Sequence, residues 1–225
     1  MKKYITMLVV SLIGYVSVAE DLPRYFSTVD DLIANVKQVD PTNVSYDTNG
    51  FIVGVVLPPG YSTDRNLHLL SQTKSVRYLL ICSGPISTNT ISALAEYPNL
   101  TGLGLVCCGG RSHHLVSELP FLTNLQSLEL SQTTYRTNDA IYLAKMTNLM
   151  ALKIAGSIPT TRAELLALTN LVNLRKLVFY GRDEYVNKVD TNIFSRLDKL
   201  TNFVVTSAID NSAVIEGVWK TPIVK

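Results

Sequence analysis

Residues 105–114 read LVCCGGRSHH and bring two adjacent cysteines and two adjacent histidines within ten residues. Thiolates and imidazoles are the ligands that zinc prefers, and together they also build thiol nucleophiles. Zinc requires four ligands in a tetrahedron, however, and adjacent cysteines such as Cys107 and Cys108 point apart in an extended segment. A common ion could bind at most one cysteine and one histidine of the two pairs, with Cys82 as a third ligand. We therefore predict no metal site here.

Other signs of catalysis are weak. Gly109-Gly110 neither follows a strand nor opens a helix with GxGxxG spacing, so nucleotide binding has no support. His113 and His114 indicate a solvated loop, and His68 in STDRNLHLL indicates an outward-facing helix residue. An enzyme built on Cys107 and the two adjacent histidines is a less favoured hypothesis. The sequence predicts a non-enzymatic protein with no catalytic residue and no cofactor.

The elements that position these residues follow from a repeat of 24–26 residues. The apolar spacing φxxφxφ, seen as Leu125, Leu128 and Leu130 in LTNLQSLEL, recurs seven times, and all 21 framework positions are aliphatic or phenylalanine. Chance rarely yields this regularity in a chain with 47% hydrophobic residues. The residues that open the seven occurrences are Ile52, Val76, Leu100, Leu125, Leu149, Leu174 and Leu200.

A second marker precedes each predicted strand. Apolar residues lie three and six positions before the openers, as Leu119 and Leu122 do, and this spacing suits a short helical turn with one inward face. Thr161-x-x-Glu164 indicates a capping box at a helix start. Further helix starts are indicated at Thr90, Asn138 and Asp139. Asparagine stands immediately before four openers, at Asn99, Asn124, Asn148 and Asn173.

Each unit is thus a short strand, a turn, a short helix and a segment that leads back to the next strand. A single unit cannot bury its apolar face alone, whereas stacked units can. The strings LTNLQSLEL, MTNLMALKI and LVNLRKLVF resemble the leucine-rich repeat family over about residues 50–205. This resemblance implies an α/β solenoid, a right-handed horseshoe segment of about seven repeats. Its parallel sheet would form the concave face and its short helices the convex face.

The resemblance extends to the cysteine-containing bacterial subtype, where position nine of the unit is small or sulfur-bearing and replaces the usual asparagine ladder. Position nine here is occupied by Gly84, Cys108, Thr133, Ser157 and Arg182. Cys108 is expected to turn inward, while Arg182 departs from the pattern and predicts irregular units after Gly181. Cys82 and Cys107 fall on neighbouring strands, so either a disulfide between them or separate structural thiols fits the register.

The repeats are predicted to occupy residues 51–207. The segments on either side of them are predicted to be distinct from the repeats. Residues 1–19 have the layout of a cleaved secretory signal peptide, which predicts a secreted or periplasmic bacterial protein with no membrane span after cleavage. Residues 20–50 predict an N-terminal helical cap, with a stripe of apolar residues behind Ser27 or Thr28 as N-cap. Residues 208–225 predict a C-terminal cap or part of an eighth unit.

The charge balance argues against two classes of partner. The chain has 20 Lys and Arg against 18 Asp and Glu, and removal of Lys2 and Lys3 with the signal peptide leaves 18 of each. A neutral protein without a dense basic run has no net attraction to nucleic acid or to anionic lipid. The remaining partner classes are proteins, peptides and glycans.

The predicted binding surface is the concave face, because strand residues at positions three, five and seven point away from the core. Tyr78, Lys176 and Tyr180 surround a small and polar middle that contains the neighbouring charges Glu129 and Lys153. Such aromatic anchors suit a protein or peptide partner. The ion pair could also be an ordinary cross-strand pair that contributes well under about 1 kcal/mol. We expect an interaction module that uses this face; the alternative is an envelope-associated structural protein that uses its caps or convex side.

Overall fold

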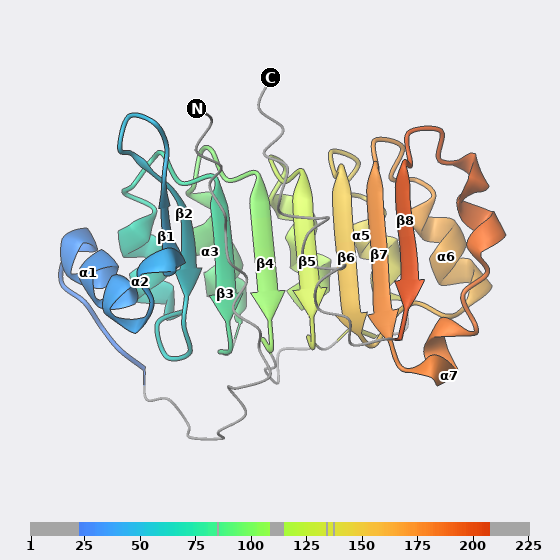
Figure 1. Cartoon of the computed structure of the whole chain (residues 1–225), viewed down its shortest axis with the longest axis horizontal. Helices are drawn as coiled ribbons and strands as arrows, with labels where there is room; N and C mark the ends of the chain where they lie inside the picture. Colours follow the sequence, from blue (N-terminus) through green and yellow to red (C-terminus); the bar gives the residue numbers. More distant parts are fainter. Residues whose placement is uncertain (1–22, 85, 109–114, 134, 137, 208–225) are drawn as a thin grey trace.

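The computed structural model describes residues 23–84, 86–108, 115–133, 135–136 and 138–207. Within them, eight strands lie side by side in one sheet in chain order, from β1 to β8 (Figure 1). The strands are β1 (Val44–Tyr46), β2 (Ile52–Leu57), β3 (Tyr78–Cys82), β4 (Gly102–Val106), β5 (Ser127–Ser131), β6 (Ala151–Gly156), β7 (Lys176–Gly181) and β8 (Asn202–Thr206). The predicted signal peptide and the predicted C-terminal cap lie outside the described residues.

The repeat register predicted from the sequence is confirmed residue by residue. Strands β2 to β8 pair in parallel, and position four of each unit faces position four of the next. This row comprises Val55, Leu79, Leu103, Leu128, Leu152, Leu177 and Phe203. From β2 to β7, the residues of positions four and six are at most 1% exposed. The equal spacing of the units therefore sets which side chains form the core.

Short helices connect the strands and lie on one side of the sheet (Figure 1). They are α2 (Asp64–Leu70), α3 (Thr88–Ala95), α4 (Leu115–Glu118), η3 (Leu119–Phe121), α5 (Asp139–Leu143), α6 (Arg162–Leu168), α7 (Asp183–Val186) and η4 (Thr191–Arg196). The apolar residues predicted to point inward, including Leu119, Leu143 and Leu168, are fully buried beneath the sheet. One or two short helices between successive repeat strands give the predicted α/β solenoid.

The predicted helix starts are mostly confirmed. Thr161 caps α6, and its hydroxyl accepts a hydrogen bond from the Glu164 N–H, while the Glu164 carboxylate accepts one from the Thr161 N–H. Helix α5 begins at Asp139 as expected. The start of α3 differs, because Ser87 is its N-cap, so that Thr90 is the third helical residue and closes a capping box on Ser87.

The N-terminal region contains a strand that the sequence did not predict. Helix α1 (Val29–Val39) is capped by Thr28 and buries Leu32, Ile33 and Val36, as expected. After the short turn η2 (Pro41–Asn43), strand β1 pairs antiparallel with β2. The sequence did not reveal β1 because it has only three residues and lacks the repeat spacing. A segment of that length is too short to show the alternation of a strand. Strand β1 thus covers the edge of the first repeat strand, and α1 packs on β1 and α2.

The unit after Gly181 is irregular, as predicted. Arg182 turns outward with an 82% exposed side chain and becomes the N-cap residue of α7. The following connection contains two short helices, α7 and η4, before β8. An arginine cannot take the inward small-residue position, so this unit leaves the path of its neighbours.

Candidate functional site

Positions three, five and seven of β3 to β8 form the outer face of the sheet, called the sheet face below. The ladder aligns Gly104, Glu129, Lys153 and Val178 as direct neighbours on successive strands. A methyl group on Gly104 would clash with Leu80 Cδ1, so this glycine lets the Leu80 side chain lie across β4. The register therefore places one ion pair between two apolar stretches of the sheet face.

The pair is much less exposed than the sequence suggested. Lys153 Nζ lies 2.6 Å from Glu129 Oε1, and the Ser131 hydroxyl donates to the same oxygen at 2.7 Å. The lysine and glutamate side chains are only 12% and 8% exposed. The pair joins the neighbouring strands β5 and β6. A shielded, hydrogen-bonded pair is a rigid charged feature of the sheet face.

The remaining predicted site residues are spread over two strands. Lys176 and Tyr180 stand near the two ends of β7, beside Ala151 and Ala155 of β6. Tyr78 lies on β3, with β4, β5 and β6 between it and β7. Between Lys176 and Tyr180, Val178 packs with Ala151 and Val204. The structure thus joins Glu129 with Lys153, and sets the two tyrosines at opposite ends of the face.

All three cysteines carry free thiols, so the disulfide that the register allowed between Cys82 and Cys107 is not formed in this structure. Cys107 instead adopts a left-handed backbone, and its thiol donates to Gln132 Oε1 at 2.9 Å. Cys108 turns inward as predicted and is 2% exposed, with its thiol donating to the Ile81 carbonyl oxygen. Burial raises the pKa of Cys82 and of Cys108 to about 12. Such thiols are poor nucleophiles.

Residues directly after the strands share an unusual backbone that the sequence did not reveal. Ser83, Cys107 and Gln132 have φ values of 59°, 54° and 51°, and Gly156 has the same sign at 101°. Their N–H groups continue the ladder; for example, Cys107 donates to the Ser131 carbonyl oxygen at 2.8 Å. Only the glycine has a residue type that indicates a left-handed turn. Stacking of equivalent turns imposes this conformation on the others.

An asparagine ladder runs along the opposite end of the strands. The side-chain N–H groups of Asn99, Asn148 and Asn173 donate to backbone carbonyl oxygens of the preceding unit at 2.8, 2.9 and 3.0 Å. Asn124 makes the same contact at 3.3 Å. These are the four asparagines before the strand openers. Position nine itself carries no asparagine, as expected, and this separate row of asparagines lies at the entrance of the strands.

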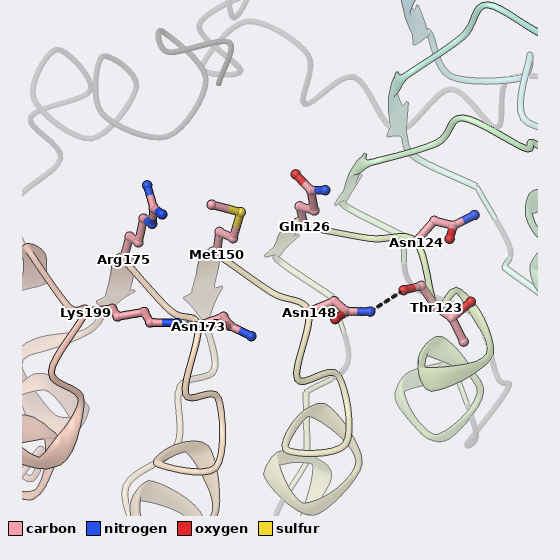
Figure 2. Close-up of a pocket in the computed structure, with 8 residues that line it drawn as sticks. All are labelled: Thr123, Asn124, Gln126, Asn148, Met150, Asn173, Arg175 and Lys199. Atoms are coloured by element: carbon pink, nitrogen blue, oxygen red, sulfur yellow. Dashed lines mark hydrogen bonds between the residues drawn. The ribbon is translucent and has the colours of Figure 1, made fainter. Parts of the chain in front are cut away.

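The ladder forms one wall of a polar groove of about 370 Å³, called the edge groove. The residues that line it are Thr123, Asn124, Gln126, Asn148, Met150, Asn173, Arg175 and Lys199. Figure 2 shows Gln126, Met150 and Arg175 in one row, above the asparagines and Lys199. Lys199 Nζ donates to Asn173 Oδ1 at 2.6 Å. We did not identify these residues as a site from the sequence, although their fixed place in each unit was a usable signal.

Two kinds of feature are absent from the part of the chain that the structure describes. No three side chains of His, Cys, Asp or Glu are grouped so that they could hold a metal ion. No helix in the described ranges has the length and apolar character needed to span a membrane. His113 and His114, with the glycine pair, lie outside those ranges, while His68 is an exposed helix residue 2.7 Å from Glu96.

Seven parallel strands in strict register, with one or two short helices between each strand and the next, decide the fold. The chain has the fold of a leucine-rich repeat protein. Its leucine-rich units are similar to solved structures of low identity, including internalin C2 from Listeria monocytogenes, with 17% identity, a TM-score of 0.39, and coverage of 79% of this chain and 86% of that one. No protein-family model matches the chain, and no curated protein matches it.

Two further leucine-rich repeat structures come from Arabidopsis. The ectodomain of the receptor kinase SOBIR1 from Arabidopsis thaliana has 14% identity and a TM-score of 0.34, and the match covers 80% of this chain and 94% of that one. The HAESA ectodomain, solved with an IDA peptide hormone ligand, has 15% identity and a TM-score of 0.31; the match covers 79% of this chain and 38% of that one. At these values the function must be argued from the residues of this chain.

Proposed function

We propose that this leucine-rich repeat protein is an exported, non-enzymatic interaction module that binds a protein or peptide through its sheet face. The strict register of β3 to β8 carries this proposal, because it repeats three outward positions per strand on one rigid surface. Tyr78 and Tyr180 offer aromatic anchors on either side of the shielded Glu129–Lys153 pair. A peptide ligand on the HAESA ectodomain is consistent with this partner class.

The test separates the anchors from the charges. We expect Tyr78→Ala and Tyr180→Ala to reduce capture of the partner from an extract of the native organism at least about tenfold, since buried aromatic anchors dominate such interfaces. Tyr142→Ala, an aromatic truncation on helix α5, is the matched control. Unchanged capture by both sheet-face variants, with unchanged thermal unfolding, would remove the site.

The charge order is tested by exchange. The double variant Glu129→Lys/Lys153→Glu keeps an ion pair between β5 and β6 but reverses its direction. If the partner contacts this pair, the exchanged protein folds and loses affinity for the partner.

Export is tested separately, by sequencing the N-terminus of the protein recovered outside the cytoplasm. Cleavage between Ala19 and Glu20 is expected.

A second function has one specific observation in its favour. Several large apolar side chains on the helical side are exposed, namely Phe121 at 68%, Val172 at 59% and Ile141 at 52%. Exposed apolar residues favour contacts with another protein. An envelope-associated structural role would use this side, and Phe121→Ser with Ile141→Ser would then abolish association while the sheet-face variants keep it.

A further inference from the structure

The edge groove differs in chemistry from the sheet face. Six of its eight residues have uncharged side chains, and four of these six are carboxamides of asparagine or glutamine. The other two are Arg175 and Lys199, so the lining contains no acidic and no aromatic residue. Among the residues that the structure describes, neither cation forms an ion pair. The groove therefore presents positive charge without a carboxylate in its own wall.

A further cation occupies an equivalent position at this strand edge outside the groove. The same two positions of the unit, the residue before each opener and the residue after it, comprise twelve residues from the second to the seventh unit. Three of these are cations, Arg77, Arg175 and Lys199, and none is an anion. Asp198 precedes Lys199 but does not line the groove. In a chain with nearly equal numbers of acidic and basic residues, these two positions of the unit thus carry only positive charge.

The carboxamides are held in a regular row. Each ladder asparagine donates one side-chain N–H to a backbone carbonyl oxygen, as Asn148 does to Thr123. This hydrogen bond fixes the orientation of the side chain. A carboxamide has two donor hydrogens and an acceptor oxygen, so the ladder does not use its full capacity. Neighbouring parallel strands lie about 4.8 Å apart, and the amides recur along the groove at that interval.

We propose that the edge groove binds an acidic polysaccharide, a chain of uronic acid residues laid across β5 to β8. Ring hydroxyls both donate and accept hydrogen bonds, as the carboxamides do. The interval between the amides is close to the advance per sugar of an extended polysaccharide. The carboxylates pair with Arg175, whose planar guanidinium can bind them in a bidentate manner, and with Lys199.

An acidic peptide fits this groove less well. An extended peptide advances about 3.4 Å per residue, which is out of step with the strand interval. Specific peptide binding also relies on apolar or aromatic anchors in pockets, and Met150 is the single large apolar side chain in the lining. Regular amides with two cations therefore favour the polysaccharide over the peptide.

The experiment measures binding of an oligogalacturonate to the purified protein by calorimetry. Neutral galacto-oligosaccharide of equal length and poly-glutamate are the comparison ligands. We expect the oligogalacturonate to bind more tightly than either, with an affinity that falls as salt rises. Arg175→Gln/Lys199→Gln should lower the affinity at least about tenfold, because two charge-assisted hydrogen-bonding groups are lost.

The matched control removes the same charge elsewhere. Arg65→Gln/Lys145→Gln changes two exposed cations of the helical side and should leave the affinity unchanged. Asn148→Ala should weaken binding with no change in net charge. The proposal is overturned if the oligogalacturonate does not bind, if both double variants lose affinity equally, or if poly-glutamate binds as tightly with the same dependence on Arg175 and Lys199. All variants are at exposed side chains, and thermal unfolding checks that each is folded.

Discussion

Among single residues, the buried thiol of Cys108 makes stability depend on pH. Burial holds its pKa near 12 in the folded protein, whereas an unfolded cysteine titrates near 8.5. Between these values the unfolded chain has lost a proton that the folded chain keeps, so stability falls as pH rises above about 9. The slope is about 1.4 kcal/mol per pH unit for each such thiol.

Replacement of that thiol should flatten the dependence. Cys108→Ala is expected to lose less stability than the unchanged protein between about pH 8 and about pH 10.5, because one of the titrating groups is gone. Urea unfolding at the two pH values measures the difference. Cys107→Ala is the control, since that thiol is less buried and its pKa is raised less. Equal losses in the Cys108 variant and the unchanged protein would contradict a buried thiol.

The Glu129–Lys153 pair gives a second prediction at this scale. Lys153→Met leaves a shielded carboxylate without its cation and should destabilise the fold by about 3 kcal/mol. Glu129→Leu/Lys153→Met removes both charges and should recover most of that loss. Chemical denaturation of the two variants supplies the comparison. A double variant as unstable as the single one would mean that the charges do not act as a pair.

At the scale of elements, the asparagine ladder ties each strand entrance to the preceding unit. Asn148→Ala removes the 2.9 Å hydrogen bond to Thr123 and is expected to cost about 1 kcal/mol. Asn170→Ala, an equally exposed asparagine whose side chain is outside the ladder, should change stability by less than about 0.5 kcal/mol. Thermal unfolding distinguishes the two variants. An equal loss of stability in both would mean that the ladder hydrogen bond does not contribute to the stability of the fold.

The whole solenoid predicts that position along the stack decides the cost of a core substitution. Leu128 is fully buried between two neighbouring units, whereas Val205 of the last described strand is only partly buried. Leu128→Ala should cost about 3 kcal/mol and Val205→Ala about 1 kcal/mol, because a terminal unit packs on one neighbour. Urea unfolding measures both, and similar costs would imply an end as well covered as the centre.

The C-terminal end of the stack gives one more prediction. Every residue of β8 is partly exposed, whereas four of the five residues of β5 are buried, and we propose that residues 208–225 cover this end. A chain ending after Thr206 should then associate through its β8 edge, because an unpaired strand edge is a template for another chain. Light scattering of the shortened and full chains measures this. A shortened chain that stays monomeric and equally stable would assign the cap to another segment.

The sequence alone determined the strands, their register and the core, because a repeat with a constant period places equivalent residues opposite one another once the units stack. It also determined that Tyr78, Glu129, Lys153, Lys176 and Tyr180 share one face. These conclusions need only the side-chain period of a strand and the length of the unit. Helix α6 was equally predictable, since Thr161 and Glu164 cap it through contacts three residues apart.

Only the tertiary structure decided how the outward residues are used. The shielding of the Glu129–Lys153 pair depends on contacts between strands and on Ser131, and no residue type announces it. The left-handed turn at Cys107 and the antiparallel strand β1 likewise depend on neighbours in space. The edge groove arises because residues about 25 apart become adjacent, so that scattered amides and two cations form one surface. The period of the repeat determines which residues become neighbours. The exposure and hydrogen bonding of those residues, and therefore the chemistry of the surface that they form, depend on the folded structure around them.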